Sequence, residues 1–322
     1  MLRDGVQELA QLGAPGQPEG QAVQSRAFVL LATARPDLRD RWRPEPGRHD
    51  LSVLNLEPLD SGAVETLVRE LLGDDATPEL VALLYERSGG NPFFVEELAA
   101  LIRESGGEAA VGAGRLPATL QGLVSARLDA LSVTERNVLE DCAVVGTSGL
   151  IEGVQALSAA RGDAVDSRAL LDNLADRGLI ELNGGEFIFP SEVVREVAYA
   201  TLTKAERARR HALLGEHLAD RLVGDDSPAA LERIAHHYGA AAEILIELGP
   251  IAGIAADLSS RALAVLEKAA DRARGAEMWK IASRLYGQAI SVLPADTTGP
   301  ARWRLLLGRG RALAEQRELP QA

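Results

Sequence analysis

The sequence predicts a mainly α-helical protein that begins with the end of an α/β unit, and three observations lead to this prediction. Helix caps followed by apolar residues at helical spacing recur from about residue 60 onward. Two continuous apolar runs that suit buried strands come before that point. The chain has 322 residues, 25% charged and 46% hydrophobic, which is the composition of a soluble globular protein of two or three domains.

The net charge and the cysteine content exclude several classes of protein. The formal net charge of −13 argues against a protein that mainly coats nucleic acid or an anionic membrane. Cys142 is the single cysteine, so a disulfide scaffold is excluded and a reducing compartment fits. The apolar run Ala27–Ala34 is too short for a membrane span or a secretory signal. We therefore expect a cytoplasmic protein with no membrane partner.

The first segments are predicted as the end of an α/β core. Residues 1–26 are rich in Gly, Pro and Gln after a partial helix and are predicted as a linker. Ala27–Ala34 is predicted as a strand of a parallel sheet, and Leu51–Leu56 as a second, shorter strand. Arg35 follows the first strand, where α/β sheets bind ligands. Position alone favours the alternative that Arg35 begins a solvated loop.

Three helices follow and complete a predicted unit over 27–104. Asp60 caps a helix to Leu72, and Thr77 with Pro78 opens a second helix to Ser88. A tight Gly-Gly-Asn-Pro turn then leads into a third helix over 92–104. Strands followed by helices alone predict an α/β core that passes into a helical lid.

Residues 115–200 follow a different pattern. Four helices are predicted over 118–131, 133–145, 150–159 and 167–177, the second opened by a capping box at Ser132–Glu135. A hairpin with an Asn-Gly turn comes next, flanked by 179–182 and 187–189. Helices followed by a two-stranded hairpin are the order of a winged-helix domain.

The remaining residues are predicted to be helical throughout. We expect a connector over 201–255 and tetratricopeptide-like (TPR-like) repeats over 256–322. Ala282, Tyr286, Ala289 and Pro294 match the second helix of such a repeat. A second copy is predicted from Leu306, Gly310 and Leu313, with Ala322 matching Ala282. The alternative is a plain bundle of helical hairpins.

Five segments together resemble the bacterial STAND-type ATPases, signalling switches of the AAA+ superclass that are often fused to LuxR-type DNA-binding or class III adenylate cyclase domains. The resemblance covers nearly the whole chain from Phe28. It implies a remnant of the ATPase sheet plus a helical lid, a winged-helix domain and TPR-like repeats. The segments are FVLLATARPDL, GNPFFVEEL, LPATLQGLVSARLDALS, FIFPSEVVREVAY and TLTKAERARRHALLGEHLA.

The resemblance also implies weak nucleotide-binding positions. Arg35 would be the sensor arginine that reaches the terminal phosphate, and a fixed guanidinium suits that role. Gly90, Asn91 and Pro92 would form the lid turn whose proline packs against adenine, although the same residues can simply start a helix. Many relatives carry a phosphate-contacting histidine where this chain has Ser191, which puts nucleotide sensing by the winged helix in doubt.

Two departures from the family bear on catalysis. No lysine follows a glycine in this sequence, so no phosphate loop of the type GxxxxGK[ST] exists, and no acidic metal-binding strand precedes residue 27. We therefore expect that this chain is not an enzyme and that it binds no cofactor by itself. ATP or ADP is the nucleotide that the parent family binds. We also expect that a separate N-terminal ATPase segment is a partner of this chain, and that the chain is a fragment of a longer gene.

Three functions follow as hypotheses. The first is a regulatory module that binds a protein partner or inducer through its repeats. The second is a DNA-binding regulator, which the charge of residues 115–200, seven Arg against thirteen Asp or Glu, disfavours. The third is an accessory cyclase segment with residual ATP or ADP binding.

The remaining candidate chemistry is sparse. His236 and His237 are adjacent, so on a helix one is expected to pack and the other to face solvent. Cys142 is expected to be a core residue. No metal site is predicted.

Overall fold

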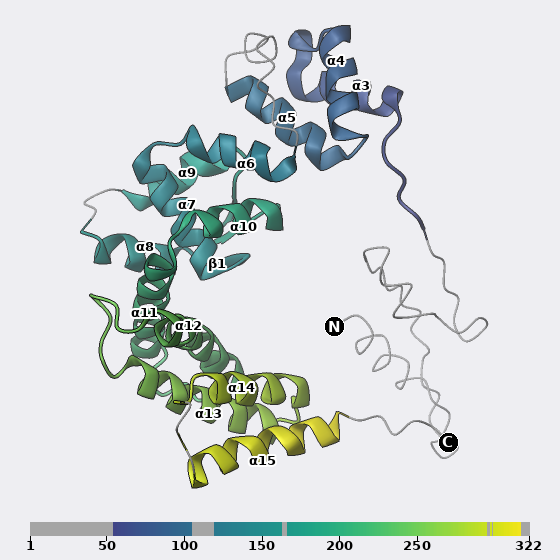
Figure 1. Ribbon diagram of the computed structural model, residues 1–322. Coiled ribbons are helices and arrows are strands. Elements are labelled where there is room, and N and C mark those ends of the chain that lie inside the picture. The colour runs from purple at the N-terminus through teal and green to yellow at the C-terminus, as the bar shows by residue number, and fades with distance from the viewer. Residues whose placement is uncertain (1–53, 105–118, 163–165, 295–296, 298, 317–322) are drawn as a thin grey trace, which may run out of the picture. The chain divides into compact units, whose positions relative to one another are not determined.

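The computed structural model describes residues 54–104, 119–162, 166–294, 297 and 299–316 (Figure 1). The chain divides into two units, Met1–Glu57 and Pro58–Ala322, and every helix and strand described below belongs to the second. The described residues are mostly helical, with one small sheet, which confirms the predicted mainly α class.

The predicted remnant of an α/β sheet falls almost wholly outside the described residues. Ala27–Ala34 is not among them, and of Leu51–Leu56 only residues 54–56 are described. Those three residues form no strand, contrary to the prediction. Leu54 and Leu56 are 83% and 93% exposed, so the burial that would turn an apolar run into a strand is missing there.

Three helices form the first bundle: α3 (Ser61–Leu72), α4 (Pro78–Ser88) and α5 (Pro92–Glu104), with a short 3-10 turn after α3. The predicted caps are present, since Asp60 accepts a hydrogen bond from the Ala63 N–H and Thr77 from that of Leu80. The apolar stripes meet in one core. Its fully buried residues include Val64, Val68, Leu84, Val95 and Leu98.

The central domain contains five helices and the sheet. The helices are α6 (Leu120–Asp129), α7 (Val133–Val145), α8 (Ile151–Ala160), α9 (Ser167–Asp176) and α10 (Glu192–Thr201). The predicted capping box of α7 is present, with Ser132 and Glu135 bonded in both directions. Helix α7 packs against α8, α9 and α10, and its buried side chains, Cys142 among them, supply the middle of the core.

The sheet of the central domain has the antiparallel order β1-β3-β2. Strands β2 (Glu181–Asn183) and β3 (Glu186–Ile188) form the predicted hairpin, shifted by one or two residues. Strand β1 (Ser148–Leu150) lies at the edge beside β3 and was not predicted. Three residues are too few to show the alternating pattern of a strand in the sequence. Strand β1 forms because these residues pair with β3.

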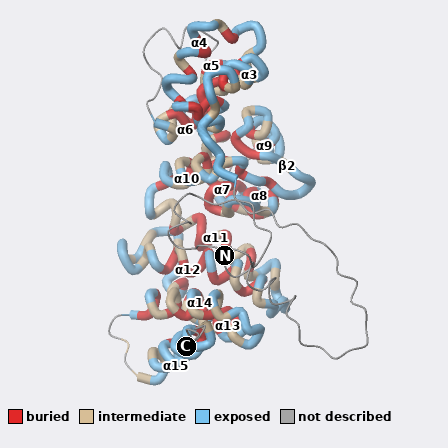
Figure 2. The backbone as a smooth tube through the Cα atoms, turned by 90° about the vertical axis from the view of Figure 1, so that its right-hand side faces the viewer, coloured by how far each residue is buried: buried red, intermediate tan, exposed pale blue. Residues whose placement is uncertain are grey.

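Five helices form the helical array, in which each helix packs on the next: α11 (Lys204–Arg221), α12 (Pro228–Leu248), α13 (Leu258–Gly275), α14 (Trp279–Ser291) and α15 (Pro300–Glu315). Buried residues recur where successive helices meet (Figure 2). Helices α11 and α12, predicted as a connector, share one continuous core with α13–α15. Nearest-neighbour packing of this kind is typical of helical repeats.

The repeat positions on α14 are interior as predicted, because Ala282, Tyr286 and Ala289 are buried. On α15 the residues that pack on α14 are instead Leu305 and Ala312, one position before the predicted Leu306 and Leu313. Leu306 and Leu313 face away and are 38% and 45% exposed. The predicted Ala322 lies outside the described residues.

Glycine allows close helix contacts twice in the array. A Cβ atom on Gly215 of α11 would lie 2.5 Å from the ring of Tyr238 on α12. A Cβ atom on Gly308 of α15 would lie 2.5 Å from the ring of Tyr286 on α14. In both places the missing side chain makes room for a tyrosine ring of the neighbouring helix.

Candidate functional site

The turn between α4 and α5 contains three of the predicted site residues. Gly89 and Gly90 have φ of +57° and +77°, a left-handed conformation that side chains other than glycine rarely adopt. A Cβ atom on Gly90 would lie 2.3 Å from the Leu59 carbonyl oxygen, and the Leu59 N–H donates to the Gly90 carbonyl at 2.8 Å. Gly90 is therefore required by the backbone itself.

Asn91 and Pro92 begin helix α5. The Asn91 side-chain oxygen accepts from the Phe94 N–H at 3.2 Å, and Pro92 occupies the first helical position, where no N–H is needed. Both residues are exposed. The Gly-Asn-Pro turn thus has a full structural explanation as a helix start, and its exposed proline remains accessible to a ligand.

Ser191 has a comparable role in the central domain. It is the N-cap of α10, and its hydroxyl accepts from the Val193 N–H at 3.2 Å. A capping serine keeps its own hydroxyl proton for a second bond. Arg35 lies outside the described residues. Contact of these residues with a nucleotide remains a prediction.

A buried arginine joins the first bundle to the central domain. Arg127 of α6 has 2% of its side chain exposed and pairs at 2.8 Å with both Glu97 and Glu104 of α5. Its guanidinium also donates to the carbonyl of Arg177 at the end of α9, at 2.6 Å. Burial alone would lower the pKa of Arg127, but the hydrogen bond with Glu104 and the charge of Glu97 hold that pKa above its ordinary value.

Apolar residues at the same place straddle the two cores. On α6, Leu123 belongs to the core of the first bundle, while Val124 and Leu128 belong to the core of the central domain. On α5, Phe94 packs in the first core and Phe93 against the second. The two parts therefore share helices α5 and α6, with the Arg127 ion network beside them.

A second buried network joins the central domain to the helical array. Arg210 of α11 pairs with Glu140 at 3.0 Å and with Asp141 at 3.2 Å, both on α7. Asp141, which is fully buried, is also held by Arg161 at 2.6 Å. Burial raises the pKa of Asp141, and the charges of Arg161 and Arg210 oppose that effect without cancelling it.

A buried histidine pair lies in the same junction, where α11 meets α12. The Nδ1 atoms of His211 and His237 are 2.9 Å apart, so one ring donates to the other, and Nε2 of His211 bonds the Tyr199 hydroxyl at 3.0 Å. Burial, with the nearby His236 and Arg207, lowers the pKa of His211 to about 3. His237 is buried and His236 exposed, which confirms the predicted division between the adjacent histidines.

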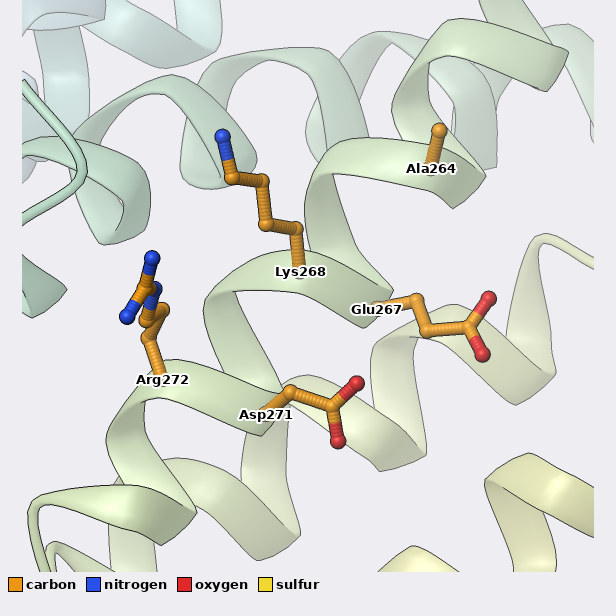
Figure 3. Close-up of a pocket in the computed structure, with 5 residues that line it drawn as sticks. All are labelled: Ala264, Glu267, Lys268, Asp271 and Arg272. Atoms are coloured by element: carbon orange, nitrogen blue, oxygen red, sulfur yellow. The ribbon is translucent and has the colours of Figure 1, made fainter. Parts of the chain in front are cut away.

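Helix α13 carries a shallow open depression on its outer face (Figure 3). Glu267 and Asp271 point to one side of it, and Lys268 and Arg272 to the other, because each pair is spaced one helical turn apart. Lys268 and Arg272 both pair with Asp226, and Glu267 pairs with Arg304 of α15. These charges connect α13 to the loop between α11 and α12 and to α15.

Sequence reasoning did not single out the two buried networks. A signal for them was present, because Arg127 interrupts an apolar stripe of α6 between Val124 and Leu128, and Asp141 adjoins the buried Cys142. A charged residue at a core position of a helix implies a buried partner. What the sequence does not show is which partner, since Glu97 and Arg177 are distant along the chain.

Comparisons with known proteins give one structural match. No protein-family model matches the sequence, and no curated protein matches it significantly. Among solved structures, a Signal Transduction ATPase with Numerous Domains (STAND) protein with a tetratricopeptide repeat sensor from Pyrococcus horikoshii matches with 17% identity and a TM-score of 0.41. The match covers 85% of this chain and 47% of that one, so this chain spans about half the length of that protein.

Among the described residues, no group of three or more His, Cys, Asp or Glu side chains is placed to hold a metal ion. None of the helices in that part of the chain combines the length and the apolar character that crossing a bilayer requires.

Proposed function

We propose that this chain is a regulatory and protein-interaction module of a STAND-type signalling ATPase, neither an enzyme nor dependent on a cofactor by itself. The order α7, β1, α8, α9, β2, β3 with sheet order β1-β3-β2 is that of a winged helix, which supports the family's predicted domain order. The absence of a glycine-lysine phosphate loop from the sequence supports a chain that does not hydrolyse ATP.

One observation carries the proposal, the buried junction at Arg210. An array of helices that presents long exposed faces is the architecture of a partner-binding arm. Here that arm is joined to the winged-helix-like part by Arg210, which lies 3.0 Å from Glu140 and 3.2 Å from Asp141. A partner that binds the array would therefore act on the central domain through this buried contact.

Direct DNA binding is not the function that we propose. The helix in the position of a recognition helix is α9. Its one arginine, Arg168, pairs with Asp172 at 3.3 Å, and Arg177, the C-cap residue that follows it, pairs with Glu135 at 3.6 Å. Asp176 is exposed on the same helix. Such a helix would repel phosphates.

The lysine distribution provides a direct test of the interaction role. The three lysines, Lys204, Lys268 and Lys280, all lie in the helical array, so an amine-reactive cross-linker reports on that part of the chain and on the N-terminal amine. Treating the native cells with such a reagent should link these lysines to another protein, identified by mass spectrometry.

The matched control is the variant with all three lysines changed to arginine, which keeps the charges but removes the reactive amines. The lysine-dependent links should disappear in it. Links confined to the chain itself, or ATP turnover by the purified chain, would overturn the proposal.

A further inference from the structure

The hydrogen bonds of the buried histidine pair cross the boundary between the central domain and the helical array. Tyr199 belongs to α10 of the central domain, whereas His211 and His237 belong to α11 and α12 of the array. The Tyr199 hydroxyl bonds Nε2 of His211 at 3.0 Å, and Nδ1 of His211 bonds Nδ1 of His237 at 2.9 Å. One imidazole ring therefore joins three helices from both sides of the boundary.

This bonding pattern limits the number of protons that the pair can hold. Because the two Nδ1 atoms face each other at 2.9 Å, one must donate and the other must accept. A ring that is protonated on both nitrogens has no acceptor, so the bond persists with at most one added proton on the pair. Two added protons would set two N–H groups against each other and break it.

The surroundings disfavour even one added proton. His211 and His237 are 3% and 5% exposed, so water cannot solvate a charge on either ring. Burial first, and then the nearby His236 and the charges of Arg207 and Arg233, lowers the pKa of the two rings. In the closed boundary both rings are therefore neutral.

The carboxylates of the helices on the central-domain side are engaged elsewhere. Glu140 and Asp141 of α7 pair with Arg210, and Asp141 also pairs with Arg161 at the end of α8. Glu152 of α8 pairs with the last residue of α11. Among the described residues, no carboxylate pairs with either histidine of the pair, so no negative charge would compensate an added proton there.

The remaining charged groups gather around His236, whose exposed ring lies beside the pair. They are Arg284 of α14, Arg195 of α10, and Glu232 and Glu243 of α12. Burial, followed by the charge of Arg284, lowers the pKa of His236. Because this ring already reaches water while the boundary is closed, opening the boundary changes its protonation less than that of the buried pair.

The apolar contact across the boundary is small. Of the described buried residues in the core of the array, Leu157 of α8 alone comes from the central domain, and the half-buried Val145 of α7 packs against that core. Leu214 of α11 lies against Gly153 of α8, 3.3 Å from the place of a Cβ atom. Separation would leave both cores largely intact, so it costs less apolar burial than the unfolding of either part.

We propose that the Tyr199–His211–His237 chain is an acid-released latch between the central domain and the helical array. When the boundary opens, water reaches the pair, and an imidazole in water takes up a proton near pH 6.5. Each pH unit below that value then favours the open boundary by up to about tenfold per proton. Burial raises the pKa of Asp141, which opposes this effect in part. The inference goes beyond the proposed interaction role and does not depend on it.

The test measures how often the boundary opens, through the reactivity of a buried thiol. Leu157→Cys, in the whole chain with Cys142→Ala, places a thiol at a position that is 1% exposed and faces the array. Native Cys142, buried in the core of the central domain, is the matched control in the unchanged chain. Both are labelled at pH 7 and pH 5 with a dipyridyl disulfide, which also reacts in acid, and each rate is divided by that of a free cysteine peptide.

We expect the corrected labelling rate of the Leu157→Cys thiol to rise at least tenfold from pH 7 to pH 5. One proton taken up near pH 6.5 shifts the opening equilibrium by about 25-fold over this range, before the opposing effect of Asp141. Cys142 should react more slowly at both pH values and with a smaller rise, because the core of the central domain stays closed.

Histidine variants of the Leu157→Cys chain identify the groups that respond to acid. His211→Gln with His237→Gln should reduce the rise at least fivefold, whereas His217→Gln, on the same helix outside the pair, should leave it unchanged. The rise is a ratio of two rates within one variant, so a variant that is only less stable still gives a clear result.

Three outcomes would overturn the inference. An equal rise for the Leu157→Cys thiol and for Cys142 would mean that acid unfolds the central domain and opens no separate boundary. A rise of less than tenfold would mean that the boundary does not respond to acid, and a full rise in the double histidine variant would assign the response to other groups. Leu214→Cys, on the array side of the same contact, is a second probe that decides if the double histidine variant does not fold.

Discussion

At the scale of single residues, Arg127 has the largest expected effect on stability. Its guanidinium contacts two carboxylates of α5 and the carbonyl of Arg177 at the end of α9. The side chains of Arg127 and of the two glutamates are at most 16% exposed. Removing one partner of a buried ion pair leaves the other charge without compensation, which costs more than the pair itself contributes.

Arg127→Met should therefore lower the free energy of unfolding by about 3–5 kcal/mol. Urea denaturation of the purified chain measures this change. The control is Arg69→Met, whose exposed pair with Glu65 should be worth no more than about 0.5 kcal/mol. Adding Glu97→Gln and Glu104→Gln to Arg127→Met should restore part of the loss, and no restoration would mean that packing, not charge, dominates.

At the scale of helix pairs, the contact between Gly215 and Tyr238 sets how closely α11 and α12 approach. Gly215→Ala should destabilise the chain by about 1–2 kcal/mol, because overpacking against the ring exceeds the gain in helix propensity. Gly310→Ala, where the added methyl group meets open space, should stabilise it by up to about 1 kcal/mol. Thermal unfolding of the two variants measures both changes in stability, and we expect the two changes to have opposite signs.

Element positions followed from local sequence far better than contacts did. Caps at Asp60, Thr77 and Ser132 and the Asn-Gly turn mark where helices and the hairpin begin, because each depends on residues three or four positions away. Strand β1 and the Arg127 network depend on partners tens of residues distant, so no local pattern identifies those partners. At the candidate site, the turn at Gly90–Pro92 was foreseeable in the same way, whereas its relation to Arg35 concerns residues outside those described.

At the scale of the whole molecule, the buried histidines predict sensitivity to acid. The pKa of His211 is lowered to about 3, and that of His237 lies well below its usual value, through burial first. In the unfolded chain both titrate near pH 6.5. Below that pH the unfolded state binds more protons than the folded state does. The free energy of unfolding therefore falls as the pH drops from about 6.5 toward 3.

The expected slope is about 1.4 kcal/mol per pH unit for His211, to which His237 adds with the same sign. Asp141 offsets it in part, because its raised pKa has the opposite effect. Urea unfolding between pH 7 and 4 measures it. The double variant His211→Gln with His237→Gln should flatten the dependence, and His217→Gln, on the same helix outside the pair, controls for the loss of a histidine. A stability that does not change over this range in the wild-type chain would contradict the prediction.

The shared helices α5 and α6 have a consequence for how such chains diverge by exchange of parts. Phe93 and Phe94 reach two different cores from adjacent positions, and Leu123 and Val124 do the same on α6. A recombination breakpoint placed between α5 and α6 would therefore separate Arg127 from its carboxylates and expose apolar surface on both products. A segment that is inherited or grafted intact must therefore keep α5 and α6 together, across what the sequence alone marks as a domain boundary, and the pairs of Arg210 with Glu140 and Asp141 extend the same requirement beyond α10 to α11.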